Sequence, residues 1–139
     1  MVTSDNSTTS NWPRQQFHKA LQHLAQHGIL PEGVTVTESR LLEPLVAIWK
    51  ISATRPKPAS YWVLSGDLPT DVASASAAAS PRDALRYFAL HWQLKAEQLR
   101  SAPAADAAQL DYAALLEGRA SGLYQIFDNT RLWSEADRR

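Results

Sequence analysis

The spacing of the hydrophobic residues changes twice along this chain, and this change limits the possible folds more than any other feature. Apolar residues recur every three or four positions before residue 28, alternate with polar ones between residues 33 and 66, and return to helical spacing after residue 80. Helical spacing is typical of amphipathic helices, and alternation is typical of half-buried strands. The sequence therefore predicts an α+β fold with an N-terminal helix, a three-stranded antiparallel meander and three C-terminal helices packed on the sheet.

The first helix is predicted between Asn11 and Gly28. Its apolar residues recur at helical spacing: Phe17, Leu21 and Leu24. Asn11 suits the N-cap, Pro13 suits the first turn, and Gly28 suits the residue that ends a helix in a left-handed conformation. Residues 1–11 are rich in Ser, Thr and Asn and have little to bury, so we expect a disordered leader there. Residues 12–139 are then expected to form a single α+β domain.

Three strands are expected in the middle of the chain. Residues 34–36 and residues 61–65 show strand-like composition, and residues 45–53 are apolar on both faces at their beginning. Apolar residues on both faces are expected of a central strand. Because proline has no N–H to donate, Pro56 and Pro58 separate the second strand from the third. An antiparallel meander is the simplest arrangement of these strands.

Three helices are expected after the sheet. Ser80 suits an N-cap and Pro81 suits the first helical position, so the first of these helices is predicted to begin there. The second is expected at residues 106–117 and the third from residue 123 onward. A break at Gly118–Gly122 is expected to separate them.

Charge and cysteine content argue against several classes of function. The 139 residues contain 14 basic and 14 acidic side chains, which argues against nucleic acid or an anionic membrane as the main partner. The absence of cysteine excludes disulfides, thiolate metal sites and cysteine nucleophiles. No stretch reaches the roughly 18–20 apolar residues of a transmembrane helix, and the polar N-terminus lacks a signal pattern. We therefore expect a cytoplasmic protein with no cofactor and no metal.

The densest polar group follows the third predicted strand and contains Asp67 and Asp71. Two carboxylates at this spacing can share a metal or act as an acid/base pair, but turn and capping roles are commoner for Asp. Arg82 and Arg86 lie one helical turn apart and would meet these carboxylates if the strand end packs against the helix start. His91, on the same helix, is interpreted as a catalytic base or as a core histidine. Two interpretations of this group stay open: a structural ion network, and a site for a carboxylate or phosphate.

His23 and His27 lie four residues apart and would share one face of the first helix. Such a pair is able to contribute to a zinc site. The helix offers no acidic or cysteine ligand, and the H-E-x-x-H pattern is absent. A solvated helix face is therefore the preferred interpretation.

An apolar patch is the best indication of function in the sequence. Most of the five tryptophans are expected in the core between the sheet and the helices. A three-stranded sheet with helices on one face leaves its other face partly open. Val46, Ile48 and Trp62 would then form an exposed apolar patch, which usually marks a protein interface.

Two strings in the chain are more specific than its composition. Residues 62–71 contain W-x-x-S-G-D-L-P-T-D, and residues 80–86 read S-P-R-D-A-L-R. With these strings the chain resembles a family of small bacterial proteins catalogued only as a domain of unknown function, over roughly residues 12–133. The resemblance supports treating this region as one domain, but it implies no activity, cofactor or catalytic residue. Val72 stands where the family pattern has an aromatic residue.

Two hypotheses of function follow. The first is a non-enzymatic protein-binding module, for example an immunity-type inhibitor or a domain that forms homodimers. The second is a small-molecule or anion-binding protein, or an enzyme with a weak signature, that uses the Asp/Arg/His group. The first needs an exposed apolar surface, whereas the second needs polar side chains that converge on a concave site.

Overall fold

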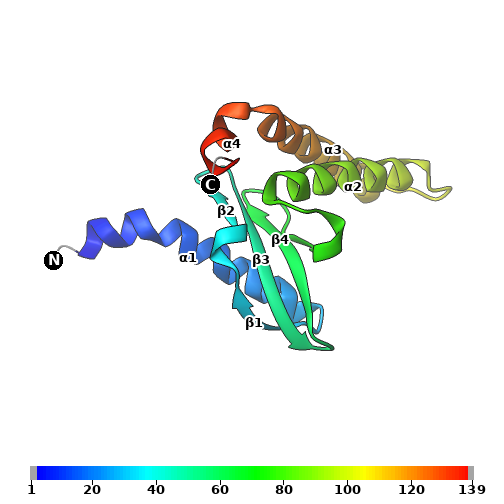
Figure 1. The fold of residues 1–139 in the computed structure, drawn as a ribbon. Helices are drawn as coiled ribbons and strands as arrows, with labels where there is room; N and C mark the ends of the chain where they lie inside the picture. The colour runs from blue at the N-terminus through cyan, green and yellow to red at the C-terminus, as the bar shows by residue number, and fades with distance from the viewer. Residues whose placement is uncertain (1–2, 138–139) are drawn as a thin grey trace. The chain divides into compact units, whose positions relative to one another are not determined.

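A computed structural model describes the backbone of residues 3–137 and the side chains of residues 11–133. The chain divides into two units, Met1–Pro81 and Arg82–Arg139, which are described separately here (Figure 1). The predicted α+β class is confirmed, because the structure has an N-terminal helix, an antiparallel sheet and C-terminal helices. A single domain over residues 12–139 stays a prediction.

Helix α1 spans Thr3–Gln26 and is longer than the sequence predicts. Residues 3–11, expected to be a disordered leader, are helical, and residues 1 and 2 lie outside the described residues. Pro13 therefore lies inside the helix, and Asn11 is not its N-cap. Extending a helix costs much less than starting one, so a polar segment can continue a helix that packing already stabilises.

The end of α1 follows the prediction. Gly28 has a φ of +71°, which is the left-handed conformation that glycine adopts without steric cost. The Ile29 N–H donates to the Leu24 carbonyl at 2.9 Å, and the Gly28 N–H donates to the Ala25 carbonyl at 3.0 Å. This pair of bonds is the Schellman arrangement, which turns the chain out of the helix and toward the sheet.

The sheet has five antiparallel strands instead of three: β1 (Leu30–Val34), β2 (Arg40–Leu42), β3 (Val46–Arg55), β4 (Ala59–Gly66) and β5 (Asp71–Ser74). Their order is β1-β3-β4-β5, and β2 also pairs with β3. β2 and β5 have only three and four residues, so alternation of side chains gives almost no signal for them. Val36 belongs to a short 3₁₀ helix, η1 (Val36–Glu38), and not to the first strand.

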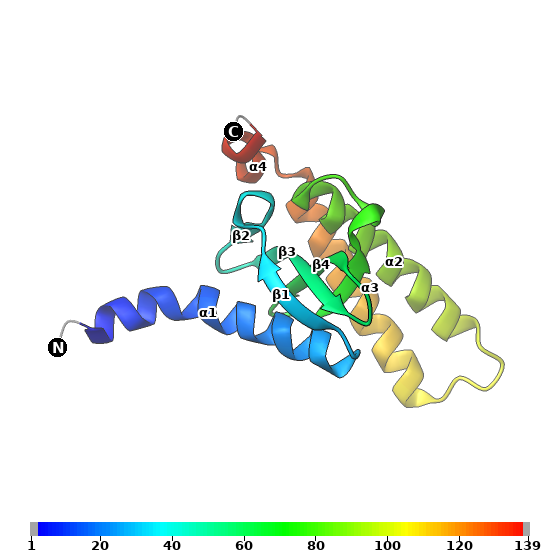
Figure 2. The same ribbon diagram turned by 60° about the horizontal axis from the view of Figure 1, so that its bottom comes forward.

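Helix α1 packs on one face of this sheet, as both ribbon views show (Figures 1 and 2). The buried residues of this layer come from α1, β3, β4 and the turn after α1: Ala20, Leu24, Ile29, Ala47, Trp49, Ile51, Ala53 and Val63. At the edge of the cluster, the rings of Phe17 and Trp49 lie 5.1 Å apart. This packing fixes α1 beside the end of β4, where the polar string of residues 65–71 begins.

The second unit consists of three helices, and its two long ones run antiparallel side by side (Figure 2). They are α2 (Pro81–Ser101), α3 (Ala107–Asp128) and α4 (Thr130–Asp137). α2 begins at Pro81, as predicted. A capping box begins α3, because the Asp106 carboxylate accepts from the Gln109 N–H and the Gln109 side chain accepts from the Asp106 N–H.

The predicted break at Gly118–Gly122 is wrong. α3 continues through both glycines, and the chain breaks at Asn129 instead. A glycine inside a helix costs about 1 kcal/mol relative to alanine. That cost is smaller than the gain from burying Leu116 and Leu123 on the same helix, so the helix continues.

Among the residues that the structure describes, no helix combines the length and the apolar character that crossing a membrane requires.

Candidate functional site

The polar string of residues 65–71 begins with Ser65, whose side chain connects α1 to the sheet. Ser65 is fully buried. Its Oγ accepts a hydrogen bond from Trp49 Nε1 at 3.2 Å and donates one to the carbonyl of Gln16 in α1 at 3.2 Å. Removing this hydroxyl would leave the buried Trp49 indole N–H without a partner, whereas the Gln16 carbonyl would keep its hydrogen bond within the helix. Ser65 therefore holds α1 against the end of β4.

Gly66 follows, and no larger residue fits its place. Its φ is +154°, and a Cβ atom would lie 2.8 Å from the carbonyl oxygen of Leu45 and 3.2 Å from the Cα of Val46. The Gly66 carbonyl accepts a hydrogen bond from Lys19 Nζ at 3.1 Å. The end of β4, where the loop of residues 67–70 begins, is thus joined to α1 at two successive residues.

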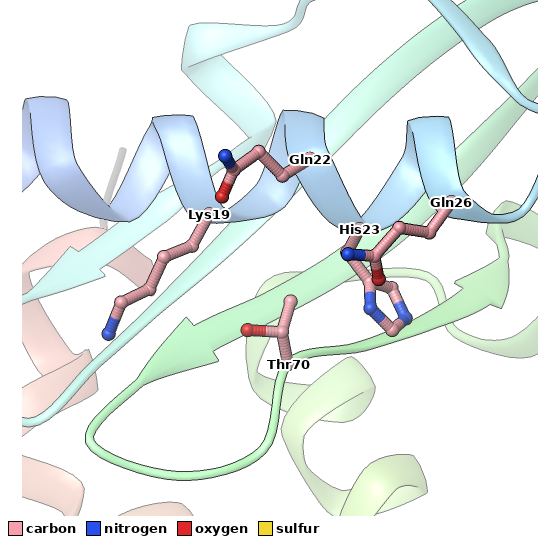
Figure 3. Close-up of a pocket in the computed structure, with 5 residues that line it drawn as sticks. All are labelled: Lys19, Gln22, His23, Gln26 and Thr70. Atoms are coloured by element: carbon pink, nitrogen blue, oxygen red, sulfur yellow. The ribbon is translucent and has the colours of Figure 1, made fainter.

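A pocket lies between α1 and this loop, with a volume of about 150 Å³. Figure 3 shows the side chains that line it: Lys19, Gln22, His23 and Gln26 from α1, and Thr70 from the loop. We call it the α1–loop pocket. All five lining residues are polar, and they carry one ammonium group, one imidazole, two amides and one hydroxyl.

His23 is the titratable group of the pocket whose environment differs most from water. Burial, and then the nearby His27, lower the pKa of His23 below its ordinary value of 6.5, while the Asp71 carboxylate opposes this shift. The two imidazole rings lie 4.4 Å apart, and His27 Nδ1 lies 2.9 Å from the His23 carbonyl oxygen. The Nε2 atom of His23 is buried and has no hydrogen-bond partner among the described residues.

The interpretation of His23 and His27 as a solvated face holds only for His27. His27 is exposed, whereas His23 is half-buried. Within the part of the chain that the structure describes, no three His, Cys, Asp or Glu side chains lie close enough to hold a metal ion together.

The two aspartates of the predicted polar group lie at opposite ends of the loop. Asp67 is exposed. Asp71 is half-buried, and its Oδ1 accepts from the Val72 N–H at 2.8 Å, which is a local role expected of aspartate near a turn. Of the two, only Asp71 acts on His23.

The other three residues of that group belong to α2. Arg82 donates from Nε and Nη2 to the Phe127 carbonyl at 3.0 and 2.8 Å, and its guanidinium lies 5.1 Å from the Phe127 ring centroid. Arg86 and His91 are both exposed, and His91 stacks on Tyr87 at 5.7 Å. The interpretation of His91 as a core histidine is therefore wrong. A convergence of all five residues on one site stays a prediction.

The expected apolar patch is not exposed. The side chains of Val46, Ile48 and Trp62 have exposed fractions of 1%, 0% and 1%. Trp62 is covered by the segment after β5, because its Nε1 donates to the carbonyls of Ala75 and Ala78 at 3.3 and 3.0 Å.

Val46 and Ile48 lie on β3, which has paired strands on both sides. The side chains of neighbouring strands flank residues on a central strand and reduce their exposure.

The sequence singles out His23 as a possible ligand and includes Thr70 in the polar string after the third predicted strand, but it does not single out Lys19, Gln22 and Gln26. A signal was present: the α1 residues stand at positions 19, 22, 23 and 26, the spacing of one helical face. Four polar residues on one face, next to an apolar stripe, indicate a polar surface at the boundary of the core.

A comparison with protein families finds the model described as Domain of unknown function (DUF4826), which matches residues 6–133. The chain belongs to this family. The resemblance expected from the two strings is thereby confirmed, and the match extends about six residues further toward the N-terminus than expected. Neither the curated proteins nor the solved structures give a significant match. The family brings no activity with it, so a functional conclusion rests on the geometry of the chain itself.

Proposed function

We propose that this member of the DUF4826 family is a non-enzymatic binding protein that holds a small polar ligand in the α1–loop pocket. The observation that carries the proposal is the convergence of five polar side chains from two segments, about 50 positions apart, on one cavity. In a concave site, convergent polar groups fix the orientation of a bound small molecule.

The way in which the loop is held supports this function. Ser65 and Gly66 each bond to α1, so Thr70 extends from a loop whose beginning is fixed. The helix and the anchored end of β4 hold the backbone of the lining residues in place before a ligand arrives. Such preorganisation reduces the entropy lost on binding.

A screen of small molecules by thermal denaturation tests the proposal, with separate anionic, cationic and neutral sets. We expect at least one set to raise the melting temperature of the wild type, since a ligand that binds only the folded state stabilises it. The variant Thr70→Val should lose that rise. Thr37→Val, the same change at an exposed threonine of the same unit, should keep it. If no compound of any set raises the melting temperature in a Thr70-dependent way, the proposal is wrong.

A second candidate is the protein-binding module, and one observation supports it. Leu90 and Leu94 are 43% and 58% exposed and lie one turn apart on α2, next to the half-buried Tyr87. An exposed apolar strip on a helix suits docking of a protein partner, either an enzyme under inhibition or a second copy of this chain.

Light scattering and a pull-down with the double variant Leu90→Ser/Leu94→Ser test this candidate. A dimer mass, or a single stoichiometric partner, that the double variant loses would support it. Leu115→Ser is the matched control, because Leu115 is a leucine of α3 with a similar exposure of 42%. A monomer that retains no partner at all would overturn it.

A further inference from the structure

We propose that the ligand of the α1–loop pocket is a small oxyanion, a carboxylate or a sulfate-like group, bound by the Lys19 ammonium, the Thr70 hydroxyl and the protonated imidazole of His23. This inference rests on the proposed function, since it names the chemical class that the same pocket takes. It is carried by the hydrogen-bond donors of the pocket, by its charges and by its size.

The donors that have no partner are the first argument. Lys19 Nζ uses one of its three N–H bonds on the Gly66 carbonyl, and no other bond from it is present within the described residues. Thr70 points its hydroxyl toward the end of the pocket where the Lys19 ammonium lies (Figure 3). The amides of Gln22 and Gln26 add N–H donors that can turn toward a ligand. Oxyanions accept several hydrogen bonds at once and match such a set.

The position of His23 is the second argument. Its ring extends from α1 toward the segment that carries Thr70 (Figure 3). Its buried Nε2 has no hydrogen-bond partner among the described residues, and such a group costs free energy unless something pairs with it. Because Nε2 is buried, a ligand in the pocket does not reach this atom. A protonated imidazole attracts an anion through its charge, and an anion is the partner that stabilises the charged form best.

The charges around His23 decide how binding depends on pH. The groups that act on it are His27 of α1, which disfavours its protonation, and Asp71 at the start of β5, which favours it. Lys19, on the same helix, lines the same pocket and brings a positive charge to it. A bound anion favours the protonated form of His23, so anion binding and protonation of His23 strengthen each other.

The size of the pocket limits the ligand. Its volume of about 150 Å³ is below the roughly 300–1,000 Å³ of pockets for drug-sized ligands. A free inorganic anion, a small carboxylate or the carboxylate of a larger molecule fits this limit. The size of the pocket therefore fits the oxyanion group itself, and the titration below distinguishes an inorganic anion from a carboxylate.

Calorimetric titration of the full chain with sodium sulfate and with sodium acetate tests the inference, at constant ionic strength with sodium chloride as the reference. We expect saturable binding of at least one anion, about threefold tighter or more at about pH 5.5 than at about pH 7.5. Sulfate stays a dianion over this range, so its pH dependence reports the protein. Binding of sulfate indicates a free inorganic anion, and binding of acetate alone indicates a carboxylate.

Two variants locate the site. Lys19→Met should weaken binding by about tenfold or more, because it removes a charge-assisted hydrogen bond and keeps the aliphatic stem. Lys57→Met removes the same charge from an exposed loop position and should leave binding unchanged. Because Lys19→Met also loses its bond to Gly66, His23→Gln serves as a second variant, and it should remove the pH dependence of binding.

The outcomes separate this inference from the proposed function. If neutral or cationic compounds bind with a dependence on Thr70 while neither anion binds, the inference is wrong and the proposed function stands. If an anion binds equally well to Lys19→Met and to Lys57→Met, its site is elsewhere and the inference is wrong. If nothing binds, both are overturned.

Discussion

Residues 65–71 and residues 80–86 both lie in the region that matches the family, but their polar side chains have different partners in the structure. In the first segment, Ser65 and Gly66 bond to α1, and Thr70 lines a pocket. In the second, Arg82 bonds to a carbonyl of α3 and lies against aromatic rings of its own unit. A distinctive string can therefore line a pocket or form a structural contact inside its own unit. The hydrogen-bond partners of its side chains distinguish the two cases.

The largest expected effect tests whether the first segment needs its exact backbone. Gly66→Ala should lower the free energy of unfolding by about 3 kcal/mol, because the new Cβ meets the Leu45 carbonyl at a positive φ. Urea denaturation measures this loss. Gly33→Ala is the control, since its Cβ would have only an ordinary contact of 3.9 Å with Ser52 Oγ and should cost far less. Equal losses for the two variants would contradict a special role for Gly66.

The next effect tests the link between Ser65 and α1. Ser65→Ala should cost about 2 kcal/mol, because it leaves the Trp49 indole N–H without its partner in the core and removes the bond to the Gln16 carbonyl of α1. Urea denaturation followed by tryptophan fluorescence gives the value. The control Ser121→Ala makes the same change at an exposed position and should stay within about 0.5 kcal/mol of the wild type. A neutral Ser65→Ala would show that the loop is not held in this way.

A smaller loss of stability is expected when the contact between Arg82 and the Phe127 carbonyl is removed. Arg82→Met should lower the free energy of unfolding by about 1.5 kcal/mol, because two charge-assisted bonds to the Phe127 carbonyl disappear from a half-buried site. Arg82→Lys should restore only part of it, since an ammonium group cannot reproduce the planar fork. Arg86→Met removes an exposed arginine one turn away and should be nearly neutral. If instead Arg86→Met lowers the free energy of unfolding more than Arg82→Met does, the contact of Arg82 with the Phe127 carbonyl is not the one that stabilises this unit.

The smallest effect concerns pH. The pKa of His23 is lowered in the folded chain, so the unfolded chain takes up this proton first as the pH falls. The contribution of His23 to stability is therefore complete above about pH 6.5 and decreases below it. Without an added anion, His23→Gln should make the free energy of unfolding decrease less between about pH 7.5 and about pH 5.5. His91→Gln, in the exposed part of α2, should show the wild-type dependence, and a flattened curve for both would assign the effect elsewhere.

Long periodic segments made most of the fold predictable. The stripe of Phe17 and Leu24 gave α1 its core face, and the alternation in residues 45–53 gave β3. The strands β2 and β5 were not predictable, because they are too short to show an alternation of apolar and polar side chains. They are strands because they pair with β3 and β4, respectively. The glycines of α3 predicted a break that the burial of Leu123 overcomes.

The candidate site was predictable only on one side. The string of residues 65–71 drew attention to the loop, and its turn residues favoured a polar surface there. Its partner surface on α1 was not predicted, because the contact between Lys19 and Gly66 joins positions 47 residues apart. Local spacing indicates which residues share a helix face, but it does not tell which loop that face will meet.

The most direct test of anion binding in the α1–loop pocket is a titration of isotopically labelled protein with sulfate at about pH 5.5, followed by backbone amide chemical shifts. If the α1–loop pocket binds the anion, we expect saturable shifts at Lys19, His23 and Thr70 and none at Arg86 and His91. Shifts confined to Arg86 and His91, or no saturable shift at any residue, would contradict it.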